Sequence, residues 1–188
     1  MCYSAQVVQS LRDYLRLMGA MPDYAQIERI LGQRLADPRV RIPRGFERNF
    51  DNPANEEEKR IRELIDQTCA AATMTLEQRL FKEKKRLADA ERKLLVKETK
   101  NALEDKRIAS NWIETSLEKL ALLKGTQGHE DDNRIFPFTY APIVINRSGR
   151  NIVTLARYHL RQKGKQASID RQMDGLYNAF GAFLTVRT

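Results

Sequence analysis

Apolar residues recur at helical spacing twice near the start of the chain. The first run predicts a helix over residues 4–18 that ends at Gly19, so Cys2 would lie just ahead of it. Its apolar face consists of Val7, Val8, Leu11, Leu15 and Met18. A second helix is predicted over residues 24–35, because Asp23 and Gln26 form a helix-start signal. Its inward face consists of Ile27, Ile30 and Leu31.

A long helical segment follows an aperiodic stretch. The stretch ADPRVRIPRGFERNFDNPAN contains three prolines and has neither a helical nor a strand period. From Ala54 to Lys124 the chain then runs for 71 residues without Gly or Pro, and strong helix formers dominate. Asn52 before Pro53 supplies a start signal, and Gly125 supplies a stop.

This long segment is predicted to fold back on itself. Leu80, Leu87 and Leu94 repeat at seven residues, which gives an apolar seam that requires a partner helix. A single rod would be roughly 107 Å long at 1.5 Å per residue, so we expect a coiled-coil hairpin that turns near residues 99–103. The residues expected to face the first arm are Ile108, Ala109, Trp112, Ile113, Leu117 and Leu120.

The period changes to that of strands after the helical segment. In APIVINRSGRNIVTLARYHL, two β-rich runs at residues 143–145 and 151–155 flank a loop that contains Gly149, which predicts a β-hairpin. The fold class is therefore α+β: a body with an N-terminal helix and a β-hairpin, interrupted by a long helical hairpin.

Composition adds a preference for anionic partners. Apolar residues make up 41% of the chain, enough for a core, and 33 basic against 25 acidic residues give a net charge of +8. Residues 55–124 are nearly balanced, with 16 basic and 14 acidic residues, whereas residues 134–187 hold nine basic and two acidic residues. The C-terminal segment is therefore the candidate anion-binding region, although a merely soluble basic surface explains the same composition.

Several classes of protein are disfavoured. The chain begins without a signal-like apolar segment and has no apolar run near the roughly 18 residues that span a bilayer, so we expect a cytoplasmic, nucleoid-associated protein that does not bind membranes. Two cysteines and two histidines never fall at metal-ligand spacing, so neither a metal nor another cofactor is predicted. Cys69, within the helical segment, is interpreted as a small core residue.

Four short elements, in order, resemble one known family. They are the opening Met1-Cys2-Tyr3-Ser4-Ala5, then Tyr140-Ala141-Pro142, Ala156-Arg157-Tyr158-His159-Leu160, and Tyr177-Asn178-Ala179. Together they resemble the SOS response-associated peptidase family, whose members process abasic sites and become covalently linked to single-stranded DNA. The resemblance covers residues 1–20 and 134–179 best. The family usually begins Met-Cys-Gly-Arg, so this chain has its own opening.

The resemblance implies a domain organisation. Residues 1–188 would form a single incomplete domain of this family, with residues 54–124 as a helical insertion and residues 180–188 as a tail outside the family pattern. After Ala179 the family has Arg and then a further stretch with a catalytic Glu and His, whereas this chain has Phe180 and ends eight residues later. We therefore expect a truncated or frameshifted reading frame. Whether this chain is itself an enzyme stays open.

The resemblance also implies a covalent chemistry for Cys2. Removal of Met1 leaves an α-amine and a thiol on one residue, and these groups ordinarily titrate near 8 and 8.5. The amine can form an imine with the aldehyde of a ring-opened abasic sugar, and the thiolate can close on it to give a thiazolidine. The family uses the same cysteine for self-processing of a propeptide. The alternative is that Cys2 is an incidental second residue.

Other site residues follow from the same resemblance. Asn178 would position the sugar or the N-terminal residue, although it also fits an ordinary turn asparagine. The predicted phosphate contacts are Arg157, Arg161, Lys163 and Lys165. Two further residues are assigned to DNA binding, Tyr158 and Pro142. Tyr158 could stack on a base or pack in the core. The expected partner is single-stranded DNA with abasic sites, and the helices could also mediate self-association.

Two other classes of function stay open. One is a noncatalytic coiled-coil interaction protein whose basic tail binds nucleic acid. The other, a conventional cysteine protease, is poorly supplied because the chain lacks a convincing Cys/His/Asn set. Replacing Cys2 with Ser should abolish covalent capture of DNA under the first hypothesis, and it should change nothing if the chain is a noncatalytic interaction protein.

Overall fold

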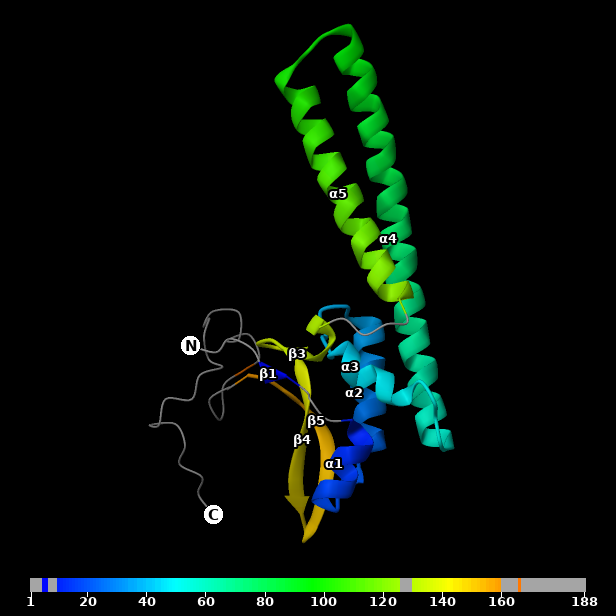
Figure 1. The fold of residues 1–188 in the computed structure, drawn as a ribbon, viewed down its shortest axis with the longest axis vertical. Coiled ribbons are helices and arrows are strands. Elements are labelled where there is room, and N and C mark those ends of the chain that lie inside the picture. The colour runs from blue at the N-terminus through cyan, green and yellow to red at the C-terminus, as the bar shows by residue number, and fades with distance from the viewer. Residues whose placement is uncertain (1–4, 7–9, 126–129, 160–165, 167–188) are drawn as a thin grey trace, which may run out of the picture. The chain divides into compact units, whose positions relative to one another are not determined.

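The computed structural model describes residues 5–6, 10–125, 130–159 and 166, and the fold is mixed α+β, as predicted (Figure 1). The chain divides into two units. The first, called the body, comprises residues 1–62 and 130–188, and the second, called the helical hairpin, comprises residues 63–129.

The first helix of the body is shorter than predicted. α1 spans Leu11–Met18 and begins at Ser10, whose side chain accepts a hydrogen bond from the Asp13 N–H. It ends at Gly19, as predicted, in the left-handed conformation with φ of 52°. The prediction of a helix over residues 4–18 is wrong at its start, because Ala5–Gln6 form strand β1. This strand pairs with β3, Arg134–Ile135, so long-range pairing overrides the local helical pattern.

The second helix confirms the sequence prediction. α2 spans Tyr24–Ala36, and the Asp23 side chain caps it by accepting a hydrogen bond from the Gln26 N–H. Its buried residues are Ile27, Ile30 and Leu31.

The aperiodic stretch folds into short helical turns that carry much of the core. α3 spans Arg44–Glu47, and the 3₁₀ turn η1 follows at Arg48–Phe50. Phe46 and Phe50 are almost fully buried and pack edge to face, with ring centroids 5.7 Å apart. Sequence periodicity missed them, because two turns are too short to establish a period.

The predicted β-hairpin is present and longer than expected. β4 spans Tyr140–Arg147 and β5 spans Arg150–Arg157, in antiparallel register from Tyr140 opposite Arg157 to Arg147 opposite Arg150. Ser148 and Gly149 form the connecting turn, both with positive φ, as a two-residue hairpin loop requires. β2, Met21–Pro22, pairs in parallel with β5, so the strand order is β2-β5-β4.

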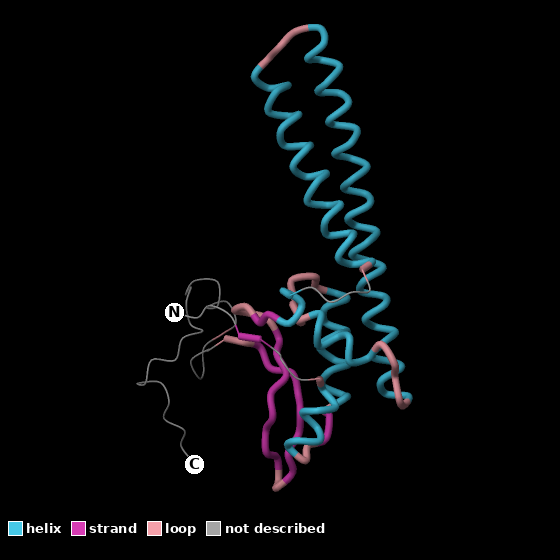
Figure 2. Tube along the Cα trace, in the orientation of Figure 1, coloured by secondary structure: helices cyan, strands magenta, loops and turns pink. Residues whose placement is uncertain are grey.

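The helices of the body pack on one side of this sheet. Figure 2 shows α1, α2 and α3 on the same side of β4 and β5. Val153 and Leu155 of β5 are buried, as are the inward residues of α2, and the two elements are in contact. The second short 3₁₀ turn, η2 at Glu130–Asn133, leads the chain back into β3.

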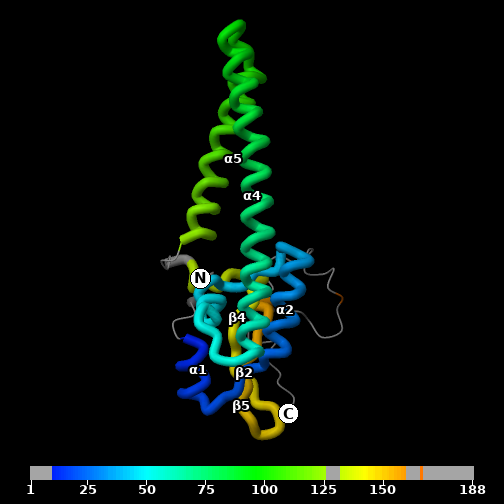
Figure 3. The backbone as a smooth tube through the Cα atoms, turned by 90° about the vertical axis from the view of Figure 1, so that its right-hand side faces the viewer, coloured from blue at the N-terminus to red at the C-terminus, as the bar shows by residue number. Residues whose placement is uncertain are grey.

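The helical segment is a hairpin of two long helices, as predicted. α4 spans Glu56–Val96, beginning in the body and continuing through the second unit, and α5 spans Lys100–Lys124 (Figure 3). The turn lies at residues 97–99, slightly before the predicted position. It ends at Thr99, whose side chain caps α5 by accepting a hydrogen bond from the Ala102 N–H.

The seam between the two helices buries several small residues, while the leucines of the predicted seam, Leu80, Leu87 and Leu94, are half-buried. Its buried positions on α5 are Ala102, Ala109, Ser116 and Leu120, and Ala90 of α4 is also buried. The prediction that Leu117 faces the first arm is wrong, because its side chain is 48% exposed and Ser116 is buried instead.

Polar contacts join the two helices along the seam. Arg86 and Asp105 pair at 2.6 Å, while Lys106 pairs with Glu91 and Lys124 with Glu77, both at 3.2 Å. The guanidinium of Arg79 lies 3.3 Å from the ring centroid of Trp112. Among the described helices, none combines the length and the apolar character needed to cross a bilayer.

Candidate nucleic-acid interface

The end of β5 forms a compact backbone arrangement with the residues that precede β4. The Tyr158 N–H donates to the Thr139 carbonyl at 2.8 Å, and the Phe138 N–H donates to the Tyr158 carbonyl at 2.9 Å. Phe138 has φ of 69°, an unusual value for a residue other than glycine. The Thr139 N–H closes the turn on the Phe136 carbonyl. The strand ladder therefore continues past β5 and fixes the positions of residues 157–159.

Three side chains meet at this strand end, and we call them the arginine-aromatic cluster: Arg157, Phe138 and His159. The Phe138 and His159 rings have centroids 4.7 Å apart and planes inclined by 33°. The Arg157 guanidinium lies 5.0 Å from the Phe138 ring centroid, within cation–π range. Arg157 is exposed, while both rings are half-buried. The cluster thus offers a cation beside stacked rings, a combination used to bind single-stranded nucleic acid.

Arg157 and Tyr158 point to opposite sides of the sheet, because successive residues of a strand alternate. Tyr158 packs against Ile135 and Ala141, which form a small buried cluster. Of the two roles considered for Tyr158, base stacking and core packing, its contacts in the structure are those of core packing. The side chain that accompanies Arg157 is Phe138 instead.

Pro142 lies on β4, directly opposite Leu155. It is half-buried, while Leu155 is almost fully buried. β4 is an edge strand of the described sheet, where proline is tolerated because its missing N–H removes no hydrogen bond to a neighbouring strand. The structure thus places Pro142 as an ordinary residue of an edge strand.

The N-terminal strand lies next to this region. Ala5 of β1 pairs with Ile135, and Ile135 belongs to the same buried cluster as Tyr158. Arg41 is also close, since its carbonyl accepts the Tyr140 N–H at 2.8 Å and its backbone forms a parallel bridge with Thr139. The exposed Arg41 therefore adds a second cation near the strand end.

Several predicted site residues lie outside the described part of the chain: Cys2, Asn178, Arg161, Lys163 and Lys165. Within it, Arg157, Tyr158 and Pro142 share one β-hairpin, but only Arg157 joins the arginine-aromatic cluster. Cys69 is a free, half-buried thiol on α4.

Sequence reasoning missed Phe138 and the part played by His159. The available signal was the run FPFTY just before β4, which places two phenylalanines beside the resemblance element. The turn that aims Phe138 at His159 depends on a positive φ, which no residue pattern indicates here.

Neither a family model, nor a curated protein, nor a solved structure matches this chain. Among the described residues, no group of three or more His, Cys, Asp or Glu side chains is arranged to hold a metal ion.

Proposed function

We propose that the protein captures abasic sites in single-stranded DNA through a covalent link to Cys2, after removal of Met1. The observation that carries the proposal is the pairing of Ala5 with Ile135, which ties the N-terminal strand to the neighbourhood of the arginine-aromatic cluster. The order of the four sequence elements that resemble the abasic-site-processing family supports the same reaction.

The short stretch of chain between Cys2 and Ala5 limits the distance of the nucleophile from strand β1. Three peptide links join Cys2 to Ala5, and an extended chain advances at most about 3.6 Å per residue. The two Cα atoms are therefore within about 11 Å of each other. A sugar bound near the strand end would be within reach of the amine and the thiol of Cys2.

The reaction balances without a cofactor. The neutral α-amine of Cys2 attacks the aldehyde carbon of the ring-opened sugar, and loss of one water gives an imine. The thiolate then adds to the same carbon, the imine nitrogen takes up a proton, and a five-membered thiazolidine closes. Both groups titrate near neutral pH in their ordinary state, so each has a reactive fraction.

The arginine-aromatic cluster would hold the DNA during this reaction. The exposed Arg157 guanidinium would contact a phosphate, and the Phe138 ring would offer a face to an adjacent base. Contacts of this kind tolerate any base, which suits a protein that recognises a lesion rather than a sequence. In this role Arg157 is the predicted phosphate contact, and Phe138 replaces Tyr158 as the stacking residue.

The test is denaturing gel electrophoresis after incubation with a single-stranded oligonucleotide that contains one abasic site. Intact-mass measurement first verifies that Met1 is absent. We expect a slowly migrating protein–DNA band that disappears in Cys2→Ser and persists in Cys69→Ser, the matched thiol control. Loss of the band in both variants, or in neither, would exclude Cys2 as the specific nucleophile.

A further inference from the structure

The part of the helical hairpin nearest its turn carries a marked excess of positive charge. We call residues 82–107 the distal hairpin; they hold ten basic and six acidic residues. The rest of the unit's described residues, 63–81 and 108–125, hold three basic and five acidic residues. The near-neutral balance of the whole segment therefore conceals two regions of opposite sign.

Most of the acidic residues of the distal hairpin are already paired. Arg86 contacts Asp105 and Glu83, Arg92 contacts Asp89, Lys106 contacts Glu91, and Arg107 contacts Glu104. The four cations of these pairs engage five of the six acidic side chains, and within the described distal hairpin only Glu98 forms no ion pair.

Six lysines are left over after this pairing. They are Lys82, Lys84, Lys85, Lys93, Lys97 and Lys100. All six are exposed, and within the described part of the chain none of them forms an ion pair with an acidic residue. At about 100° per residue, Lys82, Lys85 and Lys93 fall on one face of α4. Lys82 and Lys93 are eleven residues apart, which is about 16 Å along the helix.

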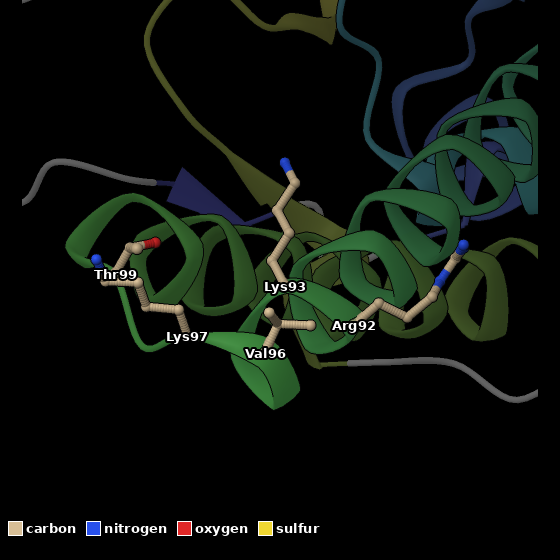
Figure 4. Close-up of a pocket in the computed structure, with 5 residues that line it drawn as sticks. All are labelled: Arg92, Lys93, Val96, Lys97 and Thr99. Atoms are coloured by element: carbon tan, nitrogen blue, oxygen red, sulfur yellow. The ribbon is translucent and has the colours of Figure 1, made fainter.

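The end of the hairpin combines these cations with a shallow apolar surface. A pocket of about 470 Å³ is lined by Arg92, Lys93, Val96, Lys97 and Thr99. Figure 4 shows Val96 between Lys97 on one side and Arg92 on the other, with the Lys93 side chain extending away from the helix. Val96 and its neighbour Leu95 are 89% and 88% exposed.

We propose that the distal hairpin is a second nucleic-acid contact surface, which binds the phosphate backbone through its unpaired lysines, chiefly the row of Lys82, Lys85 and Lys93 along α4 and Lys97 at its end. The inference goes beyond the proposed function, because it requires neither Cys2 nor an abasic site. The face from Lys82 to Lys93 extends about 16 Å along the helix, so it is long enough to contact several consecutive phosphates of one strand. Because lysine binds phosphate as a point charge, the contact would be independent of sequence.

An anionic membrane is the competing partner, since exposed aliphatic residues beside lysines also suit a lipid surface. The distribution of charge favours nucleic acid. A flat bilayer would meet the hairpin end, whereas the lysines continue along the side of α4 as far as Lys82. A linear polyanion can contact that whole row.

The test measures binding of the full chain to a fluorescent single-stranded oligonucleotide without an abasic site, over a series of salt concentrations. Lys93→Gln/Lys97→Gln removes two distal charges, and Lys119→Gln/Lys124→Gln is the matched control that removes two charges from the same helical hairpin outside the distal region. We expect the slope of log K against log salt to fall by about 1.4 in the distal variant, since each phosphate contact contributes about 0.7. The control should keep the wild-type slope.

Three results would overturn this inference. One is a wild-type slope in the distal variant, and another is an equal fall in both variants, which would reflect net charge alone. The third is binding to vesicles rich in phosphatidylserine, abolished by Leu95→Ser/Val96→Ser, without binding to the oligonucleotide. Because the probe has no aldehyde, each of these results is independent of whether Cys2 reacts with abasic sites.

Discussion

The body and the helical hairpin are stabilised in different ways. The body buries large side chains almost completely, including Phe46, Phe50 and Ile61. The hairpin seam instead buries small residues such as Ala102, Ala109 and Ser116, and polar pairs link its two helices. Burial of apolar area contributes about 25 cal/mol per Å², so the large side chains of the body contribute far more per residue.

This difference indicates how each unit can carry function. The body has the rigid core that a positioned cluster such as Arg157 and Phe138 requires. The hairpin depends on helix-forming residues and a narrow seam, so its outer faces are free to carry unpaired charge.

Phe46→Ala should destabilise the body by about 4 kcal/mol, because it opens a cavity at a residue that is only 2% exposed. Urea denaturation followed by circular dichroism measures the change in the free energy of unfolding. The matched control is Phe81→Ala on α4, where the side chain is 76% exposed and the change should stay within about 0.5 kcal/mol. Similar losses in both variants would contradict the contrast between the units.

Glu47→Gln should cost about 3 kcal/mol, since it leaves the Arg34 guanidinium in a largely buried pair without its carboxylate. The same denaturation experiment gives the change. Glu104→Gln in the hairpin breaks an exposed pair with Arg107 and should leave the unfolding midpoint unaltered. If the hairpin substitution is the more damaging of the two, exposed ion pairs stabilise this protein more than buried ones.

Ala109→Leu should destabilise the helical hairpin by about 2 kcal/mol, because Ala109 is fully buried and a larger side chain there has to displace its neighbours. Thermal unfolding monitored at the helical signal measures the loss. Ala88→Leu adds the same side chain at an exposed position of α4 and serves as the control. A stabilised Ala109→Leu would mean that the seam is loosely packed.

A small pH effect is expected from Tyr24 in the body. Its hydroxyl donates to Glu58 at 2.7 Å, and burial, with the neighbouring Glu58 carboxylate, raises the pKa of Tyr24 above its usual value of 10.0. A raised pKa in the folded state stabilises the fold below the unfolded-state pKa, and this contribution is lost as pH rises through the folded-state pKa. The free energy of unfolding should therefore fall above about pH 10.

Tyr24→Phe should remove this part of the alkaline loss, whereas Tyr14→Phe on α1 should retain it. The measurement is urea denaturation between about pH 8 and pH 11. An unchanged pH dependence in Tyr24→Phe would rule out the assigned origin.

Local signals determined how much of the fold could be predicted. α2 combines a capping aspartate with a regular apolar period, and the sequence predicts both its ends and its buried face. β1 is a two-residue strand whose partner, β3, is far away in the chain, so no local pattern indicates it. The apolar pattern predicts Leu117 in the seam, but the buried residue at this point of α5 is its polar neighbour Ser116, which hydrophobic periodicity cannot indicate.

The candidate site shows the same limit. Arg157 follows directly from a strand-end motif, and strand alternation could have separated it from Tyr158. Phe138 could not be assigned, because its contact with Arg157 involves a turn with positive φ whose backbone is hydrogen-bonded to Tyr158, 20 residues further along the chain.

The most direct test of the proposed function is the mass of the N-terminal peptide, after cross-linking to abasic DNA and digestion with a protease and a nuclease. The proposal predicts a peptide that begins at Cys2 and carries the sugar remnant with loss of one water, unchanged by borohydride because the thiazolidine has no imine left to reduce. An unmodified Cys2 peptide, with the DNA attached to a lysine or to Cys69, would contradict it.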